Sequence, residues 1–235
     1  MLDVIAFDAD DTLWDNERLY IEAKERFFSL MAECHDPADC ERRLEEIETH
    51  NVRHYGYGIK SFILSMIEAA LELSEDRVAA DKIRQILGFA HEMLAAEVRL
   101  IDGVGEVVAT LAQRFPLMLI TKGEASEQQR KIEESGLANY FKWVEIVPNK
   151  TPEVYRAILE RYAIPPEGFL MVGNSLRSDV LPVLKIGGQA VLVHYANNWL
   201  HEMQVDEDNL EHHKLDSLRQ LPDYVEKLGR TQIKD

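Results

Sequence analysis

The chain has 235 residues, of which 46% are hydrophobic and 29% are charged, as in an ordinary globular protein of one or two domains. Its 42 acidic residues outnumber its 26 basic residues, which gives a formal net charge of −16. Such a surface repels nucleic acid and anionic membranes, and we therefore expect neither as a partner.

The start of the chain has no basic segment followed by a long apolar one, and no apolar run reaches the ~18 residues of a membrane span. We therefore expect no signal peptide, no transmembrane helix and a cytoplasmic location. The sequence leaves open whether the protein is a monomer or a homodimer.

The first predicted element is a strand. Residues 2–7 form a short apolar run that stops at Asp8, Asp10 and Asp11, as expected of a buried strand that ends in a polar loop. A solvated acidic turn is the alternative, but three aspartates directly after an apolar strand make a poor turn without a ligand.

From Asn16 to about Glu97 the pattern is helical, because apolar residues recur at i, i+4, i+8 and i+11. These positions are Leu19, Ala23, Phe27 and Leu30, and again Phe62, Met66, Ala70 and Leu73. Segments 35–37 and 55–58 break the periodicity, and residues 74–76 are expected to begin another helix. We expect about four helices and no strand in this block.

Beyond residue 105, predicted helices alternate with short apolar strands. The helices are expected at about 106–114, 126–135, 152–162 and 179–186, and the strands at 117–120, 143–147, 169–172 and 190–193. This alternation predicts an α/β fold, a Rossmann-like parallel sheet with helices on both faces. The first strand must join that sheet, so the expected domains are a core of residues 1–14 and 101–235 and an inserted helical-bundle cap of residues 15–100.

Polar side chains follow each predicted strand, and ligands bind at the carboxyl ends of the strands in open parallel sheets. The set consists of Asp8, Asp10, Thr12, Thr121, Lys122, Gly123, Lys150, Asn174 and Asp179. Carboxylates packed this closely repel one another unless a hard dication lies among them, and Mg²⁺ is the natural occupant. Thr121 alone would indicate a helix cap, and Lys150 alone would indicate a surface lysine. The prediction of a ligand site therefore depends on the whole set.

Taken in order, Asp8-x-Asp10-x-Thr12, Thr121, Lys150 and the loop from Gly173 to Asp179 resemble the four motifs of the haloacid dehalogenase (HAD) superfamily of phosphohydrolases. The helical insertion resembles the C1 cap of that superfamily. The resemblance covers essentially the whole chain, and it implies an enzyme that hydrolyses the phosphate ester of a small metabolite with Mg²⁺ as cofactor.

The resemblance also implies roles for the first motif. Asp8 is expected to attack phosphorus and form an aspartyl-phosphate, which splits one difficult displacement into two easier ones. Asp10 is expected to protonate the leaving oxygen and then to deprotonate the attacking water. Asp8 and the backbone carbonyl of Asp10 are expected to bind the metal, and Thr12 to contact the substrate.

The other motifs are expected to complete the site. Thr121 would bind the phosphoryl group, helped by backbone N–H groups around Lys122 and Gly123, and Lys150 would neutralise the developing charge. Asn174 and Asp179 would finish the metal site. The family commonly has aspartate where this chain has Asn174, so the site has one negative charge fewer, and the sequence leaves open which of the two residues is the direct ligand.

Other reactions on the same fold give the alternative hypotheses about function. A 2-haloacid dehalogenase needs no metal and lacks the second aspartate of the first motif, so Asp10 favours phosphoryl transfer. Phosphomutase chemistry uses the same aspartate pair and stays open. A catalytically weakened binding module is supported only by Asn174.

Substrate choice is expected to depend on the cap. The segment around Tyr55, Tyr57 and Lys60 combines two aromatic rings with a cation, and we expect these residues to contact the substrate. The alternative is a turn between two helices in which the tyrosines pack on neighbouring helices.

Overall fold

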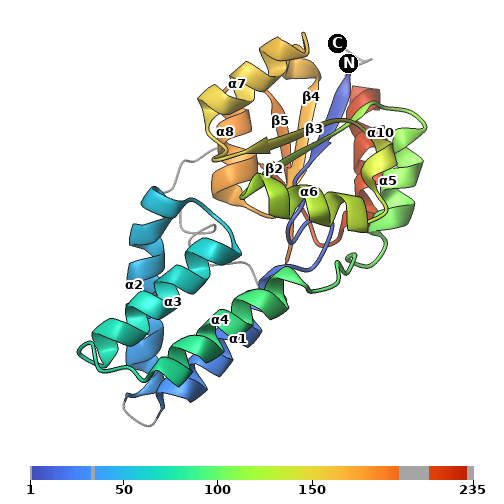
Figure 1. The fold of residues 1–235 in the computed structure, drawn as a ribbon. Helices are drawn as coiled ribbons and strands as arrows, with labels where there is room; N and C mark the ends of the chain where they lie inside the picture. Colours follow the sequence, from blue (N-terminus) through green and yellow to red (C-terminus); the bar gives the residue numbers. More distant parts are fainter. Residues whose placement is uncertain (1, 33–34, 196–211, 232–235) are drawn as a thin grey trace. The chain divides into compact units, whose positions relative to one another are not determined.

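The structure is a computed structural model that describes residues 2–32, 35–195 and 212–231 (Figure 1). The chain divides into two compact units. One comprises Met1–Glu17 and Val98–Asp235, and the other comprises Arg18–Glu97.

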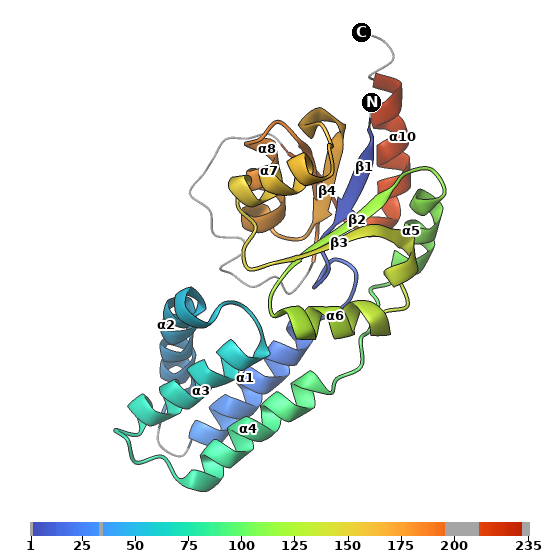
Figure 2. The same ribbon diagram turned by 45° about the horizontal axis from the view of Figure 1, so that its top comes forward.

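The first unit is built on a six-stranded sheet in which every neighbouring pair of strands is parallel. Its strands are β1 (Val4–Phe7), β2 (Leu117–Lys122), β3 (Phe141–Val147), β4 (Phe169–Gly173), β5 (Gln189–Val193) and β6 (His213–Leu215). Their spatial order is β3-β2-β1-β4-β5-β6, so β1 lies inside the sheet between β2 and β4 (Figure 2). The prediction of a parallel α/β sheet that includes the first strand is confirmed.

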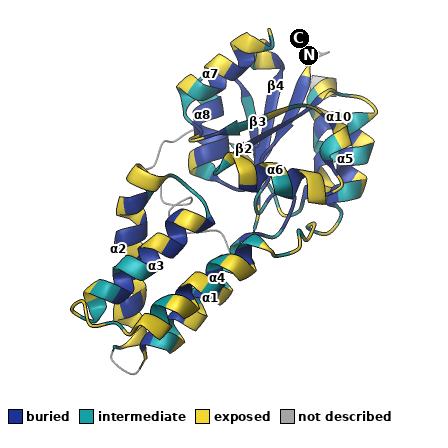
Figure 3. Cartoon of the chain, viewed as in Figure 1, coloured by how far each residue is buried: buried dark blue, intermediate teal, exposed yellow. Residues whose placement is uncertain are grey.

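Helices cover both faces of the sheet (Figure 1). They are α5 (Val104–Ala112), α6 (Ala125–Glu134), α7 (Pro152–Arg161), α8 (Leu181–Leu184) and α10 (Leu221–Thr231). In β1, Ile5 and Phe7 join the core under α5 and α10, whereas Val4 and Ala6 join the core under α7 and α8. Because successive side chains of a strand point to opposite faces, this central strand is apolar throughout and buried (Figure 3).

The second unit consists of four helices around one apolar core. They are α1 (Glu17–Met31), α2 (Pro37–Tyr55), α3 (Ile59–Leu73) and α4 (Ala80–Leu94). The described part of this unit contains no strand, as expected. Among all described residues, no helix combines the length and the apolar composition needed to cross a membrane.

The predicted start of the fourth helix was wrong. Glu75 and Asp76 have positive φ angles of 51° and 61°, so residues 74–76 form the turn after α3 and α4 begins only at Ala80. The break at 35–37 has a local cause, because the Asp36 side chain accepts a hydrogen bond of 2.9 Å from Ala38 N and Pro37 opens α2.

The two chain segments at the insertion point pair with each other within the first unit. Trp14 and Leu100 form an antiparallel bridge, flanked by hydrogen bonds from Ile101 N to Leu13 O (3.0 Å) and from Asp15 N to Arg99 O (2.9 Å). Since these segments pair and Leu13 and Trp14 are buried in the core of the sheet, the first unit extends three residues beyond each predicted boundary.

Candidate active site

A buried cluster of three charged side chains lies at the carboxyl ends of β1 and β4. Asp8 is 7% exposed, Lys150 3% and Asp179 0%. The Lys150 ammonium donates a close hydrogen bond to Asp8 Oδ1 and a second one, of 2.7 Å, to Asp179 Oδ1. The chain therefore brings one ammonium between two carboxylates that are far apart in sequence.

Burial and charge act against each other in this cluster. Burial raises the pKa of Asp179 to about 7, an effect that the nearby charge of Asp8 reinforces and that of Lys150 opposes. Burial by itself would lower the pKa of Lys150, but the charges of Asp179 and Asp8 outweigh it and raise that pKa to about 12. Lys150 is thus a fixed positive charge at neutral pH.

The loop that carries Asp179 folds back on itself after β4. Asp179 Oδ2 accepts a hydrogen bond of 3.0 Å from Ser175 N, and Ser178 N donates one of 2.9 Å to Ser175 Oγ. A Cβ atom on Gly173 would overlap the Asp179 carboxylate, so only glycine allows this close approach. The predicted helix at 179–186 is wrong in its start, because residues Leu176–Val180 form a wider π-helical turn that precedes α8.

Two further oxygen atoms converge beside Asp8. The Thr12 hydroxyl lies 3.1 Å from Asp8 Oδ2 and 3.0 Å from Asn174 Oδ1. These contacts bring a carboxylate, a hydroxyl and an amide oxygen together at one point. These hard oxygen donors fit Mg²⁺.

The charge at this site is low for a dication. No group of three or more His, Cys, Asp or Glu side chains in the described ranges is placed to hold a metal. Of the expected ligands, only Asp8 and Asp179 bring carboxylates to the cluster. Asn174 is neutral, and Asp10 is expected to contribute only its backbone carbonyl.

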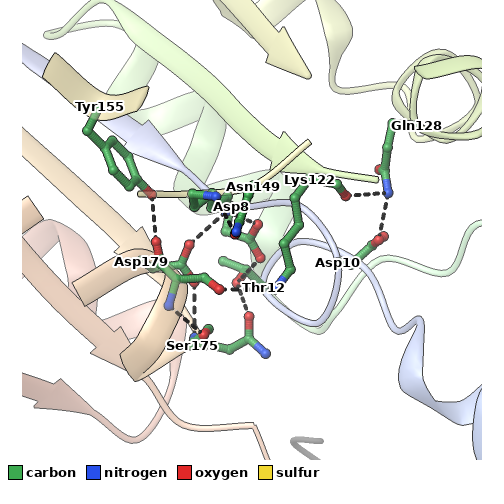
Figure 4. A network of polar contacts seen from close by, with 12 residues as sticks. Asp8, Asp10, Thr12, Lys122, Gln128, Asn149, Tyr155, Ser175 and Asp179 are labelled. Atoms are coloured by element: carbon green, nitrogen blue, oxygen red, sulfur yellow. Dashed lines mark hydrogen bonds and ion pairs between the residues drawn. The ribbon is translucent and has the colours of Figure 1, made fainter. Parts of the chain in front are cut away.

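The carboxylate of Asp10 lies elsewhere. Its oxygens accept hydrogen bonds from Trp14 Nε1 (2.6 Å), Gln128 Nε2 (2.8 Å) and Lys131 Nζ (2.7 and 2.8 Å). Figure 4 shows it beside Gln128 and apart from Asp8 and Asp179. Burial by itself would raise the pKa of Asp10, but the charge and hydrogen bonds of Lys131, with those of Gln128 and Trp14, lower it below the ordinary value.

The residues of α6 that hold Asp10 were not predicted from the sequence. Glu127, Gln128 and Lys131 are buried on the inward face of this helix, with Ile132 as their apolar neighbour. Their i, i+1 and i+4 spacing puts them on one face, where an ordinary covering helix would carry apolar residues. A helix that turns a polar face toward the protein interior was the available signal.

The residues predicted at the end of β2 lie at the same edge of the sheet. Thr121 is buried, and Lys122 Nζ donates a hydrogen bond of 3.0 Å to Ser178 Oγ, which joins the end of β2 to the loop after β4. Gly123 has a φ of 134°, and a Cβ atom there would lie 2.9 Å from Gln128 Nε2. Glycine at this position leaves room for the side chain that reaches Asp10.

The predicted substrate residues of the cap belong to the second unit. Tyr55 ends α2 and is 57% exposed, Tyr57 is half-buried in the connection, and Lys60 is exposed in the first turn of α3. The segment is a helix-to-helix connection. Contact with substrate stays a prediction for all three residues.

Comparison with known proteins gives consistent matches. The sequence model of the haloacid dehalogenase-like hydrolases matches residues 2–187. The glyceraldehyde 3-phosphate phosphatase of Pyrococcus furiosus is 26% identical over 82% of this chain and 80% of its own length. The 5-amino-6-(5-phospho-D-ribitylamino)uracil phosphatase YigB of Escherichia coli is 24% identical over 83% and 85%.

Solved structures share the fold. A haloacid dehalogenase-like family hydrolase from Xanthomonas campestris is 38% identical, with a TM-score of 0.86 and coverage of 98% of this chain and 94% of its own. The putative hydrolase YfnB of Bacillus subtilis, solved with bound magnesium, has a TM-score of 0.67 at 19% identity and coverage of 95% and 98%.

Proposed function

Because this chain belongs to the haloacid dehalogenase-like hydrolases, we propose that it hydrolyses the phosphate monoester of a small metabolite with Asp8 as the nucleophile and Mg²⁺ as the cofactor. The relatives named as phosphatases support action on phosphate esters. Their named substrates are small phosphorylated metabolites, which supports the same class of substrate here.

The observation that carries this proposal is the contact of Lys150 with both Asp8 and Asp179. The attack on phosphorus is made by a carboxylate oxygen, and a buried ammonium in contact with Asp8 holds that carboxylate in place. The same ammonium also offsets the charge of the incoming phosphoryl group. An ordinary buried ion pair would need one carboxylate, whereas this lysine contacts two at the carboxyl edge of the sheet.

The proposed reaction has two displacements. An oxygen of Asp8 forms a bond to phosphorus while the bond from phosphorus to the ester oxygen breaks. The departing alcohol takes a proton from Asp10, which must first take up that proton because its pKa without substrate lies below the ordinary value. Water then attacks phosphorus and gives a proton to Asp10, and the Asp8–phosphorus bond breaks to release phosphate. Thr121 and the backbone N–H groups around Lys122 and Gly123 bind the phosphoryl oxygens in both steps.

Magnesium, when bound, would neutralise charge on the phosphoryl oxygens and orient them toward Asp8. Asp8, Asn174, Asp179 and the backbone carbonyl of Asp10 are the residues proposed to hold it. In the second unit, Tyr55, Tyr57 and Lys60 are proposed to contact the substrate outside its phosphoryl group.

Phosphate release from a panel of phosphate esters, measured with and without Mg²⁺, tests the proposal. Asp8→Asn should lower turnover to below about 10⁻³ of the wild-type rate, because the amide cannot form the phosphoenzyme. The thermal midpoint should fall less than in a variant without Lys150, since the amide keeps the shape of the side chain and Lys150 keeps Asp179 as its ionic partner. Retained turnover in this variant would refute the mechanism.

The same panel separates the alternatives. A sugar-phosphate isomer formed without free phosphate would indicate a mutase, and halide release from a 2-haloacid without metal would indicate a dehalogenase. Magnesium binding without turnover of any ester would indicate a binding module.

A further inference from the structure

Lys131, on the polar face of α6, contacts Asp10 and two other side chains. Lys131 Nζ lies 2.7 and 2.8 Å from the two carboxylate oxygens and 3.3 Å from Asn16 Oδ1. It also lies 3.5 Å from Glu127 Oε1 and is itself buried. A buried lysine shared among several acceptors is expensive to desolvate, so its position calls for a specific reason.

We propose that Lys131 is a positioning residue that, together with Gln128, keeps the carboxylate of Asp10 out of the coordination sphere of the dication. This inference rests on the proposed function, because it concerns the metal and the acid–base residue of that reaction.

The charge of the site favours capture of a further carboxylate. With both carboxylates ionised, as metal ligands must be, Asp8 and Asp179 carry two negative charges and Lys150 one positive charge, so these side chains sum to −1. A dication there is under-neutralised and attracts the next carboxylate along the chain. That carboxylate is Asp10, two residues from Asp8.

The carboxylate of Asp10 is already engaged by hydrogen bonds on both oxygens. An ionised carboxylate has about four lone-pair positions, and four N–H···O contacts from Trp14, Gln128 and Lys131 surround Asp10. Each oxygen accepts one contact from Lys131 and one from a neutral side chain. A metal ion could take an oxygen of Asp10 only by displacing one of these donors.

The turn after β2 leaves space for Gln128 beside Asp10. Its amide donates both to Asp10 Oδ2 (2.8 Å) and to Lys122 O (3.2 Å), so it ties Asp10 to the end of β2. The amide passes over Gly123, where any Cβ atom would press against it. The hydrogen bond from Gln128 to Asp10 therefore depends on glycine at position 123, in the turn proposed to bind phosphate.

Magnesium titration of the full-length chain by calorimetry, without substrate, tests the inference. In Lys131→Met, which keeps an unbranched side chain but removes the charge, Asp10 becomes free to bind the metal. We expect Mg²⁺ to bind about 10-fold more tightly than to the wild type, while turnover of an alkyl phosphate falls about 10-fold or more. Lys131→Arg should restore the wild-type affinity.

Two controls separate a metal ligand from simple loss of positive charge. Arg130→Met removes the same charge from a half-buried neighbouring position of α6, where the guanidinium pairs with Glu134, and should leave the affinity unchanged. The affinity gain of Lys131→Met should disappear when Asp10→Asn is added, because the variant then lacks the extra carboxylate. A gain that persists in the Asp10→Asn background would overturn the inference, as would an unchanged or weaker affinity in Lys131→Met.

Gln128→Leu provides a second route if Lys131→Met does not fold. It removes one neutral donor from Asp10 and should give a smaller gain in affinity of the same sign, whereas no gain would count against the inference. The proposed function fails separately, if the wild-type chain binds no Mg²⁺ or releases no phosphate from any ester.

Discussion

Replacing Lys150 with methionine tests the electrostatic basis of the site. The ammonium contacts both Asp8 and Asp179, and all three groups are buried. Removing one partner of a buried ion pair leaves uncompensated charge, which costs about 3–5 kcal/mol of unfolding free energy. We expect a loss in this range for Lys150→Met at about pH 8, measured by urea denaturation, and turnover reduced by about 10²-fold or more.

The stability lost in Lys150→Met should depend on pH, and the pKa of Asp179 decides whether this loss grows or shrinks as the pH rises. Burial already raises the pKa of Asp179 to about 7. Lys150→Met removes the positive charge that opposes this rise. A raised native pKa gives stability that is complete below the unfolded pKa, near 4, and is lost as pH rises through the native pKa. The variant should therefore lose more stability than the wild type between about pH 5 and pH 8.

Magnesium gives an independent check on the same reasoning. A dication can replace the missing ammonium between Asp8 and Asp179, so added Mg²⁺ should stabilise Lys150→Met more than the wild type. At 100 times its dissociation constant, a ligand adds about 2.7 kcal/mol. The reasoning is refuted if the variant is as stable as the wild type at both pH values, or if its deficit grows toward low pH.

Two further variants probe the loops around the cluster. Gly173→Ala places a Cβ atom against the Asp179 carboxylate. We therefore expect turnover to fall about 100-fold and the midpoint of urea denaturation to drop. Unchanged turnover together with an unchanged midpoint would contradict the close approach of Gly173 to Asp179. Burial raises the pKa of Asp11 to about 7 although Glu17 N and Asn16 N donate to it. Relative to Asp11→Asn, the wild type should therefore lose up to about 4 kcal/mol of stability between about pH 4 and pH 8, and a difference that does not change with pH would contradict this.

The sheet was predictable because its strands are short and apolar and alternate with helices. β6 and α10 were not predicted. The three residues of β6, His213–Leu215, offer no apolar run, so only the hydrogen bonds to β5 make them a strand. Tertiary pairing decides such an element, and local sequence does not.

The gathering of Asp8, Lys150 and Asp179 was predictable from topology alone, since each follows a predicted strand and parallel strands end at one edge. Their catalytic roles stay predictions. The position of the Asp10 carboxylate was not predictable in this way. It depends on how close α6 lies to the loop after β1, and that distance is set by packing across the sheet rather than by spacing along the chain.

The bridge between Trp14 and Leu100 means that the chain leaves and re-enters the sheet-bearing unit at neighbouring points. β1 and β2 are hydrogen-bonded directly to each other, so their register does not depend on what is inserted between them. The intervening stretch can be lengthened, shortened or exchanged during evolution while the sheet and the cluster of Asp8, Lys150 and Asp179 at its carboxyl edge keep their geometry.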